Sequence, residues 1–355
     1  MIFNSVFFEL LRACQFKCKY CYERGFRNNS KRKITFEECR RVVDMMLEKS
    51  DFIQVSFGGG EPLILFKQVI KPLTEYCATL KGKEVNININ TNGQFLHTET
   101  LQFCKDHSVK LSVSLDGPKH MHDVNRIFIK DGKGTYDSII GRINEMIEMD
   151  LPLTVCQATY NIDTVQYLYE SYLMAKSLRF KDWYAAPDIF NCVWEKKHFQ
   201  ILQEQYSHIC DDYFSTPRVM GVSNLDNCSM GNPRFKIKSK TLIVEVNGNI
   251  RVGRQNATLI TPELDTHWYI GHLDEELINQ DRLDAFIEKF GEDANMYFYA
   301  KPSILCKHCP VSYCYKGDNP LLQEICQYQP PIQCYQKRLL AQQIKEKKEL
   351  YGISE

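Results

Sequence analysis

Short apolar runs alternate with longer segments of helical periodicity through the first 210 residues of the chain. Apolar runs of this length, bounded by polar or glycine residues, predict buried strands. We predict strands at residues 6–11, 53–57, 85–90, 110–115, 153–159 and 182–186. The segments that follow them predict helices at residues 35–48, 66–79, 98–107, 136–148, 164–177 and 195–210. The first helix has a capping signal, Thr35-Phe36-Glu37-Glu38, at its start.

Six successive strand-then-helix units predict an α/β fold with a parallel sheet. Six units are too few to close the usual eight-stranded (β/α) barrel, so we expect a partial, open barrel of the TIM type. In such barrels the active site gathers at the carboxyl ends of the strands. Candidate functional residues are therefore expected in the loops that follow the strands.

The pattern changes after about residue 215, where we expect a small α+β, cysteine-rich domain. Asn247-Gly248-Asn249 separates two β-rich runs at 241–246 and 250–252, which predicts a hairpin. A polar helix is predicted near 281–290, a cysteine-rich stretch covers 306–334, and a charged helix is predicted at 335–351. We therefore predict a barrel at 1–215, a second domain at 216–340 and a helical tail at 341–355.

Charge and hydropathy exclude several classes of partner. The chain has 44 basic and 44 acidic residues, so its net charge indicates neither a nucleic-acid nor an anionic-membrane partner. A basic run at 24–33 is interpreted as a solvated loop. The start of the chain lacks a secretory signal, and no stretch approaches the roughly 20 apolar residues of a spanning helix. We therefore expect a cytoplasmic protein.

The fifteen cysteines are the unusual feature of the composition. In a cytosolic enzyme, clustered cysteines more often indicate metal binding or catalysis than disulfides. Most of the isolated ones lie in apolar helix or strand patterns and are interpreted as core residues; they are Cys39, Cys77, Cys104, Cys156 and Cys210. Cys192 follows the sixth predicted strand and is a catalytic candidate.

Cys14, Cys18 and Cys21 follow the first predicted strand with the spacing C-x3-C-x2-C. Three such thiolates suit a [4Fe–4S] cluster, because structural zinc takes four ligands. A cubane held by three cysteines leaves one iron open to chelate the methionine part of S-adenosylmethionine (SAM). Reduction then breaks the sulfonium C–S bond and yields a 5′-deoxyadenosyl radical. Tyr20 is a candidate to lie against the adenine. The alternative is three buried or zinc-bound cysteines.

Polar and glycine-rich motifs end the next predicted strands. Gly59-Gly60-Glu61-Pro62 follows the second strand, Asn90-Thr91-Asn92-Gly93 the third and Ser114-Leu115-Asp116-Gly117 the fourth, and Gln157 lies on the fifth. Each alone is more often a turn. Together with the cysteine triplet they resemble the radical SAM superfamily over nearly all of residues 5–200.

The resemblance implies roles for several of these residues. The family's GGEP motif binds the methionine amino group, which corresponds to Gly59, Gly60 and Glu61. Ser114 and Asp116 suit the ribose hydroxyls, and Asn92 and Gln157 are further polar candidates. These assignments rest on the family's motifs.

His122-Asp123-x2-Arg126 and Asp131-Gly132-x-Gly134-Thr135 follow the fourth motif. They resemble the branch of anaerobic sulfatase maturases and peptide-modifying maturases of ribosomal peptides. In that branch the arginine contacts the SAM carboxylate, which implies this role for Arg126. The alternative is a basic side chain on a surface loop.

The second cysteine region resembles a partial SPASM domain, the extension that carries auxiliary [4Fe–4S] clusters in this branch. Its candidate ligands are Cys228, Cys306, Cys309, Cys314, Cys326 and Cys334. Gly253 and Asp318 stand where the family has cysteines, and Cys326 has no counterpart. The outer cluster keeps a full set in Cys306, Cys309, Cys314 and Cys334. The resemblance therefore implies one auxiliary cluster, or a second with rearranged ligands such as Cys326 or Asp318. A zinc ribbon is the alternative.

The leading functional hypothesis is radical modification of a peptide or protein, such as cross-linking, oxidation or epimerisation. In sulfatase maturases a catalytic Asp follows the inner-cluster cysteine, and here the pair is Gly253-Arg254, which disfavours that route. The implied partners are the peptide and a flavodoxin- or ferredoxin-type electron donor. Because the first strand starts close to residue 1, we expect any leader recognition to use another surface of the chain or a separate leader-binding protein. Alternatives are a dehydrogenase, epimerase or transferase for a sugar or amino acid, and a non-enzymatic iron–sulfur or zinc protein.

Overall fold

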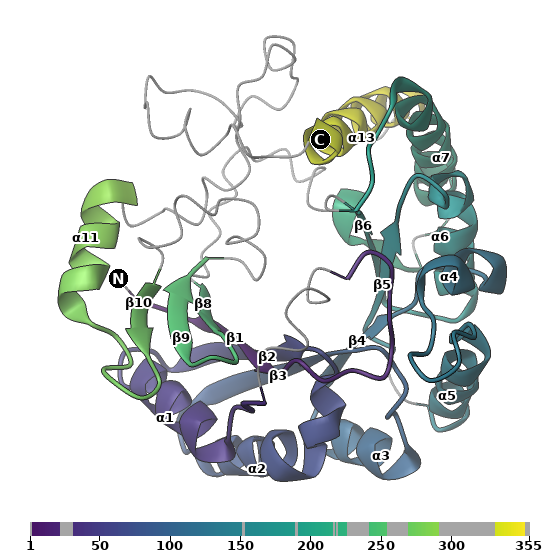
Figure 1. Cartoon of the computed structure of the whole chain (residues 1–355). Helices are drawn as coiled ribbons and strands as arrows, with labels where there is room; N and C mark the ends of the chain where they lie inside the picture. The colour runs from purple at the N-terminus through teal and green to yellow at the C-terminus, as the bar shows by residue number, and fades with distance from the viewer. Residues whose placement is uncertain are drawn as a thin grey trace.

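One continuous β-sheet forms the centre of the molecule (Figure 1). The computed structural model describes residues 2–21, 31–150, 153–188, 191–215, 217, 219–225, 241–253, 269–290 and 331–351. Its strands are β1 (Ser5–Leu11), β2 (Phe52–Gly59), β3 (Glu84–Thr91), β4 (Lys110–Ser114), β5 (Val155–Tyr160), β6 (Asp182–Pro187), β7 (Gly221–Val222), β8 (Thr241–Val244), β9 (Asn249–Val252) and β10 (Tyr269–His272). Within these residues the strand order is β10-β9-β8-β1-β2-β3-β4-β5-β6-β7.

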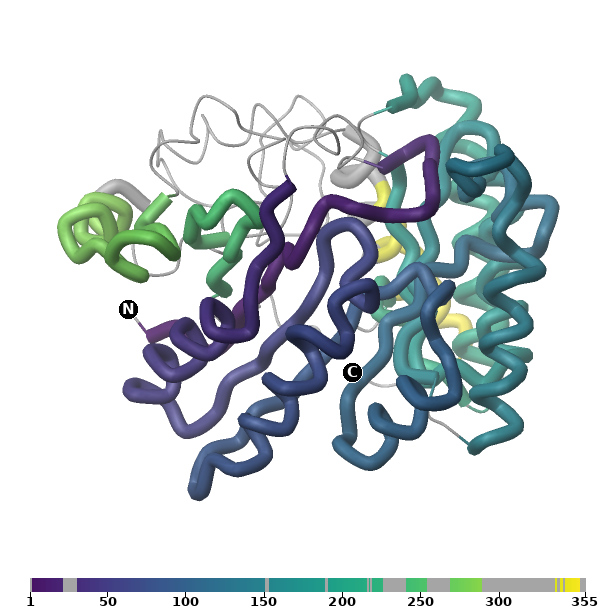
Figure 2. Tube along the Cα trace, turned by 60° about the horizontal axis from the view of Figure 1, so that its bottom comes forward, coloured from purple at the N-terminus to yellow at the C-terminus, as the bar shows by residue number. Residues whose placement is uncertain are grey.

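The helices lie on the outer side of the curved sheet (Figures 1 and 2). They are α1 (Phe36–Leu47), α2 (Lys71–Thr79), α3 (Thr98–Asp106), α4 (Lys119–Asn125), α5 (Tyr136–Glu148), α6 (Leu168–Ser177), α7 (Lys196–Ser215), α11 (Gln280–Phe290) and α13 (Pro331–Tyr351). A 3₁₀ turn (Pro62–Leu65) and a π-helical turn (Phe66–Ile70) precede α2. The predicted open, parallel barrel is therefore confirmed, with each of the six predicted strands within two residues of its observed bounds.

Local sequence explains most of these elements. Thr35 and Glu38 form the predicted capping box of α1, in which the Glu38 N–H donates to Thr35 Oγ1 and the Thr35 N–H donates to Glu38 Oε2. The helix predicted from residue 66 instead becomes α-helical at Lys71, because Pro72 has no N–H to continue an α-helical ladder. The five preceding residues, Phe66–Ile70, form the π-helical turn instead.

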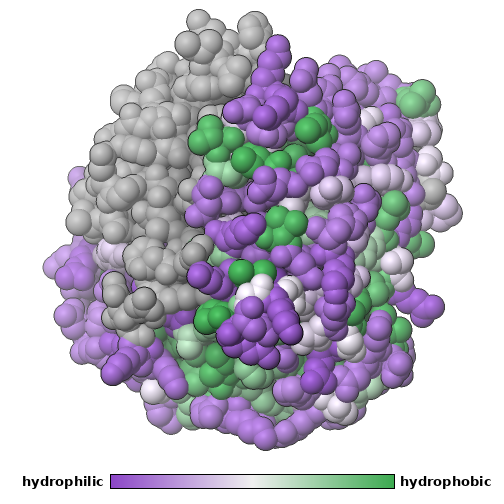
Figure 3. Space-filling model, turned by 45° about the vertical axis from the view of Figure 1, so that its right-hand side comes forward, coloured by the Kyte–Doolittle hydropathy of each residue, from purple (hydrophilic) through white to green (hydrophobic). Residues whose placement is uncertain are grey.

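Alternation along the strands separates the two faces of the sheet. In β2, Ile53, Val55 and Phe57 are buried in the apolar core that the helices cover. In the neighbouring strand β3, Asn88 and Asn90 alternate with buried isoleucines and are only half-buried. The concave face of the barrel is therefore polar, while the convex face packs against helices. The outward helical layer is largely hydrophilic, with separate apolar patches (Figure 3).

The predicted hairpin at Asn247-Gly248-Asn249 is present as β8 and β9, which pair antiparallel. Its placement could not be read from the sequence. Strand β8 pairs in parallel with β1, with Ser5 opposite Thr241 and Phe8 opposite Val244. The sheet thus continues across the domain boundary near residue 215, which stays a prediction.

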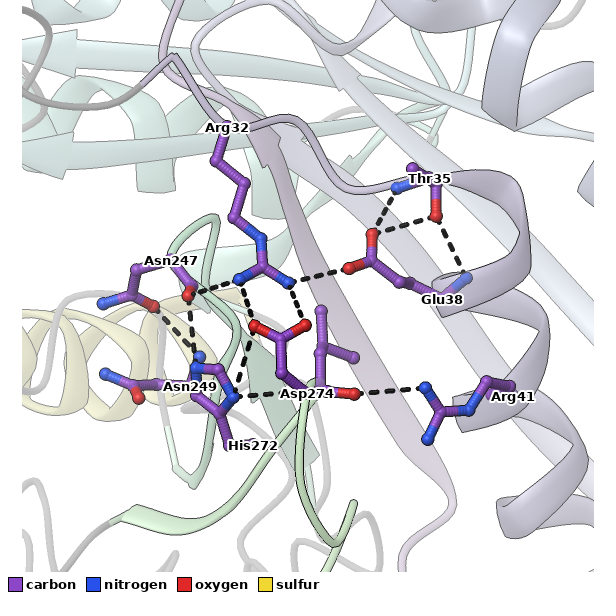
Figure 4. Close-up of polar contacts among 9 residues, drawn as sticks. Arg32, Thr35, Glu38, Arg41, Asn247, Asn249, His272 and Asp274 are labelled. Atoms are coloured by element: carbon purple, nitrogen blue, oxygen red, sulfur yellow. Dashed lines mark hydrogen bonds and ion pairs between the residues drawn. The ribbon is translucent and has the colours of Figure 1, made fainter.

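Arg32 links this extension to the barrel (Figure 4). Its guanidinium donates to Glu38 Oε1 at 2.7 Å, to Asp274 Oδ2 at 2.8 Å and to the backbone oxygen of Asn247 at 3.0 Å. At the other end of the sheet, α13 packs against α7, where Gln336 Nε2 donates to the Ala185 backbone oxygen at 3.2 Å. No helix among the described residues is long and apolar enough to cross a membrane.

Candidate functional site

The cysteine loop follows β1 and forms one side of a short antiparallel ribbon. The N–H of Lys17 donates to the Ile127 oxygen at 2.8 Å, and the N–H of Lys19 donates to the Asn125 oxygen at 3.0 Å. Phe16 and Phe128 bridge the ribbon, with ring centroids 5.1 Å apart. Because side chains alternate along such a ribbon, one face is turned into the protein and the other toward solvent.

Cys14 has two N–H groups directed at its sulfur. The Phe16 N–H lies 3.4 Å and Asn92 Nδ2 lies 3.5 Å from Cys14 Sγ. The orientation of the Asn92 amide follows from its other contacts. The backbone N–H of Gln94 can only donate, and it reaches Asn92 Oδ1 at 3.0 Å, so the NH₂ group must be the one that points at sulfur.

Cys18 lies on the inner face of the ribbon and is buried. Arg126 Nη1 lies 4.0 Å from its sulfur. Burial raises the pKa of the Cys18 thiol to about 12, although the Arg126 charge acts in the opposite direction. The apo thiol is therefore neutral at pH 7, and binding to iron or zinc must displace its proton.

The glycines after β2 are required by the close approach of the cysteine loop. The Gly60 N–H donates to the Leu11 oxygen at 2.7 Å, and the Glu61 N–H donates to the Ala13 oxygen at 2.9 Å. A Cβ on Gly60 would lie 2.2 Å from that same Ala13 oxygen. Gly59 has a positive φ of 103°, which glycine adopts most readily. The glycine motif thus holds the chain just before Cys14.

Gly60→Ala is expected to displace residues 12–14, because the added methyl group collides with backbone that cannot move independently. We expect a loss of about 1–3 kcal/mol in the free energy of unfolding and reduced iron after reconstitution. Gly141→Ala in α5 is the matched control, since its Cβ meets nothing within 4 Å and alanine favours helix. Urea unfolding and iron analysis of both variants measure the difference, and equal behaviour would contradict this account.

Glu61 is fully buried, and three protein donors occupy its carboxylate. Leu63 N–H and Thr91 Oγ1 donate to Oε1 at 3.0 and 2.8 Å, and the Asn92 N–H donates to Oε2 at 2.8 Å. Burial raises its pKa to about 7, against the effect of these hydrogen bonds. Glu61 therefore fixes the turn that carries Asn92 against Cys14. Its predicted contact with the methionine amino group stays a prediction.

The raised pKa of Glu61 predicts a pH dependence of stability. The folded state holds the Glu61 proton more tightly than the unfolded state does. The stability that this proton contributes is therefore fully present below about pH 4.5 and is lost as the pH rises toward about 7. Its size is on the order of 3 kcal/mol. Urea unfolding of the apoprotein from pH 4.5 to 7.5 should show this decline, and Glu61→Gln should remove it from the profile. An unchanged slope in the variant would show that another group is responsible.

Asp116 is the centre of a buried polar cluster. Its Oδ1 accepts from Arg126 Nε and from the Thr159 N–H, both at 3.0 Å, and its Oδ2 accepts from the Tyr20 hydroxyl at 2.5 Å. Asp116 is 0 % exposed and Arg126 is 7 % exposed. The alternative of a surface position for Arg126 is therefore wrong. The Asp116 carboxylate is occupied by protein donors, and its proposed ribose contact stays a prediction.

His122 secures the same cluster from α4. The Asp116 N–H donates to His122 Nδ1 at 3.2 Å, and His122 Nε2 lies 2.9 Å from Thr135 Oγ1, whose hydroxyl donates to the Arg126 backbone oxygen. Burial and then the Arg126 charge hold the pKa of His122 well below its usual range, so the ring is neutral. Thr135 ends the Asp131–Thr135 motif, but the motif assigns it no role in this cluster, and nothing local in the sequence distinguishes Thr159 from other threonines.

The remaining predicted residues divide into two groups. Ser114 and Gln157 lie opposite each other on β4 and β5 and are half-buried. Cys192 is half-buried after β6, its Sγ lies 3.4 Å from the Asp188 oxygen, and burial raises its pKa to about 11. The five cysteines interpreted as core residues are buried. Outside the described residues or side chains lie Cys228, Cys306, Cys309, Cys314, Asp318, Cys326 and Cys334.

The chemistry around the cysteine loop fits a [4Fe–4S] cluster. The Asn92 amide and the Arg126 guanidinium point at the sulfurs of Cys14 and Cys18, and such donors stabilise the negative charge of cluster thiolates. Within the described part of the chain, no three His, Cys, Asp or Glu side chains gather around one metal-ion position. A cubane does not require that convergence, because each thiolate binds a different iron.

A partial β/α barrel with a three-cysteine loop after its first strand is the architecture of a radical SAM domain. The model of the family described as the Radical SAM superfamily matches residues 8–170 of this chain. The family implies a [4Fe–4S] cluster and SAM as cofactors.

Curated relatives match over limited lengths. The serine-type anaerobic sulfatase-maturating enzyme of Bacteroides thetaiotaomicron is 29 % identical over 142 residues, which is 37 % of this chain and 33 % of that protein. The cysteine-type enzyme of Clostridium perfringens strain 13 is 27 % identical over 121 residues, 32 % of this chain and 33 % of that protein. The chain thus spans about a third of the length of these relatives.

Solved structures match over most of the chain. Native anSMEcpe with bound AdoMet and the Cp18Cys peptide superposes with a TM-score of 0.73 at 16 % identity, covering 98 % of this chain and 99 % of that one. Streptococcus suis SuiB bound to the precursor peptide SuiA superposes with a TM-score of 0.62 at 14 % identity, covering 92 % of this chain and 76 % of that one. At these identities the likeness establishes the fold.

Proposed function

We propose that this chain is a radical SAM enzyme that modifies a peptide or protein. The observation that carries the proposal is the loop of Cys14, Cys18 and Cys21, held at the carboxyl ends of the parallel strands with protein donors directed at two of its sulfurs. When bound and reduced, the cluster supplies the electron that cleaves SAM into methionine and a 5′-deoxyadenosyl radical, which abstracts a hydrogen atom from the substrate.

Each residue of the site has a role in this proposal. Cys14, Cys18 and Cys21 are the ligands, and Asn92 fixes the Cys14 sulfur from the loop after β3. Asp116 keeps Arg126 and Tyr20 in place beside Cys18 through charge-assisted hydrogen bonds. Gly59, Gly60 and Glu61 hold the preceding chain, and Ser114 and Gln157 remain the candidates for polar contacts with SAM.

A peptide substrate is supported by the polar concave face and by the neighbours. Asn88 donates to Asn90 Oδ1 at 3.0 Å, and Ser112 Oγ donates to Asn88 Oδ1 at 3.1 Å, which gives a row of uncharged amide and hydroxyl groups. Such groups pair well with peptide amides. Two relatives act as sulfatase-maturating enzymes by name, and two structural neighbours hold peptides. Gly253-Arg254 disfavours sulfatase maturation, so cross-linking, oxidation and epimerisation are the proposed outcomes.

We further propose one auxiliary [4Fe–4S] cluster on Cys306, Cys309, Cys314 and Cys334, with Cys228 and Cys326 as the candidates for a second. Its role is to accept or relay an electron from the substrate. A flavodoxin- or ferredoxin-type protein supplies electrons to the first cluster, and leader recognition is proposed to use another surface of this chain or a separate protein. Iron and zinc analysis of a Cys14/Cys18/Cys21 triple alanine variant tests the auxiliary site, where bound zinc without iron would contradict the cluster.

The activity is tested with anaerobically reconstituted protein, dithionite and SAM. The expected result is formation of 5′-deoxyadenosine, with a mass change in a candidate peptide encoded beside the gene. If the enzyme turns over a sugar or a free amino acid but none of the peptides tested, the proposed substrate class is wrong. Absence of 5′-deoxyadenosine from protein with a full complement of iron would contradict radical SAM chemistry altogether.

A further inference from the structure

The outer face of the cysteine-loop ribbon carries exposed lysines. Lys17 and Lys19 alternate along the loop with the buried Phe16 and Cys18 and are exposed. The inner face therefore carries a cluster ligand, while the outer face of the same strand carries positive charge. One layer of polypeptide separates the two.

The other side of the ribbon extends this charged surface. The Ile129 N–H donates to the Gln15 oxygen at 3.0 Å, and the Phe128 N–H donates to the Lys133 oxygen at 2.8 Å. These bonds hold the turn with Lys130 and Lys133, both exposed, against the cysteine loop. Ile129 lies among them and is 55 % exposed. We define this set, Lys17, Lys19, Ile129, Lys130 and Lys133, as the lysine face.

The lysine face has the composition of a transient docking surface. The set contains four exposed lysines and one exposed aliphatic side chain, and Asp131 is the acidic residue on the same turn. Electron-transfer complexes use small interfaces, and complementary charge raises their association rate more than their lifetime. An acidic partner would be attracted here, whereas the chain as a whole carries no net charge.

We propose that the lysine face docks an acidic, one-electron carrier protein that reduces the cluster on Cys14, Cys18 and Cys21. The inference rests on the proposed function, which needs one electron for each SAM cleaved. The electron passes from the reduced carrier through the ribbon to the oxidised cluster, so the carrier is oxidised as the cluster is reduced. Electron transfer slows steeply with distance, and this ribbon brings the protein surface close to Cys18.

The test compares two reductants in the absence of any peptide. Reduced flavodoxin must dock, whereas dithionite is a small reductant that need not. In the Lys17→Glu/Lys130→Glu variant, flavodoxin-driven formation of 5′-deoxyadenosine at low salt is expected to fall at least about tenfold, while the dithionite-driven rate stays the same. The wild-type flavodoxin-driven rate should also fall with added salt, and the variant should lose most of that dependence.

Lys81→Glu/Lys110→Glu is the matched control. Both lysines are exposed: Lys81 precedes β3 and Lys110 is the first residue of β4, at the opposite end of the strands from the cysteine loop. This variant has the same change in net charge and should keep the wild-type flavodoxin-driven rate. An equal loss in the control would overturn the proposal, because the effect would then come from total charge.

The remaining outcomes are also decisive. An unchanged flavodoxin-driven rate in Lys17→Glu/Lys130→Glu overturns the proposed docking surface. The same result is expected if the lysine face binds an acidic peptide instead of the carrier, because no peptide is present in the assay. If both reductants fail with that variant, Lys130→Glu/Lys133→Glu, which leaves the cysteine loop untouched, decides between docking and damage to the loop. Wild-type protein that forms no 5′-deoxyadenosine with dithionite contradicts the proposed function; reduction of its cluster by flavodoxin, followed by absorbance, still reports on docking.

Discussion

Cys18→Ala is expected to abolish formation of 5′-deoxyadenosine and to remove one cluster, about four iron atoms per chain. Cys18 is the buried member of the triplet, on the inner face of the ribbon beside Arg126. Alanine cannot bind iron, and the loop has no second thiol at that position to replace it. Iron analysis and chromatography of the products after reconstitution with SAM and dithionite measure both effects.

Cys104→Ala is the control for this experiment. Cys104 is buried in α3, and burial raises the pKa of its thiol to about 12, so it behaves as a small apolar side chain. Its replacement should cost about 1 kcal/mol of stability and leave the iron content and the product unchanged. Iron that persists in Cys18→Ala, with activity intact, would contradict the ligand assignment.

Asp116→Ala is expected to lower the free energy of unfolding by about 3–5 kcal/mol, the usual result of breaking a buried ion pair. The reason is that the substitution leaves the Arg126 guanidinium buried without its carboxylate partner, 3.0 Å away in the wild type. It also removes the acceptor of the Tyr20 hydroxyl. Urea unfolding of the apoprotein at pH 7 measures the loss without interference from the cluster.

Two further variants distinguish the effect of breaking a buried ion pair from the effect of losing one charge. Asp137→Ala removes a carboxylate that is paired with Lys119 at the surface, and it should leave the urea midpoint nearly unchanged. Asp116→Ala/Arg126→Met should be more stable than Asp116→Ala alone, because the uncompensated charge is gone. A double variant that is less stable than the single one would show that Arg126 is stabilised by groups other than Asp116.

The auxiliary metal site is predicted from the sequence alone. The cysteine pattern at 306–334 predicts an auxiliary metal site, but its ligands lie outside the described residues or side chains. Thiolates at these spacings suit iron–sulfur and zinc alike. Composition cannot distinguish the two, because both metals use the same ligand atoms. The metal content of the triple alanine variant is therefore the measurement that matters most for this region.

Arg126 illustrates a wrong alternative that the sequence left open. Its motif, His122-Asp123-x2-Arg126, is compatible with a surface loop as well as with a buried site. Burial depends on what packs against the loop, and here Tyr20 and Asp116 come from two other loops, 106 and 10 residues away along the chain. Such contacts leave no local signal, so periodicity cannot predict them.

The six β/α units, the open barrel and the position of Cys14, Cys18 and Cys21 after the first strand could all be predicted from the amino-acid sequence alone. These features follow from local rules, because hydrophobic periodicity, capping and glycine preference act within a few residues. Three further features became visible in the folded protein: β8 pairs with β1, Glu61 turns inward to hold Asn92, and Asp116 joins Tyr20 to Arg126. Each of these depends on residues that are distant in sequence, and the packing of the whole barrel brings them together.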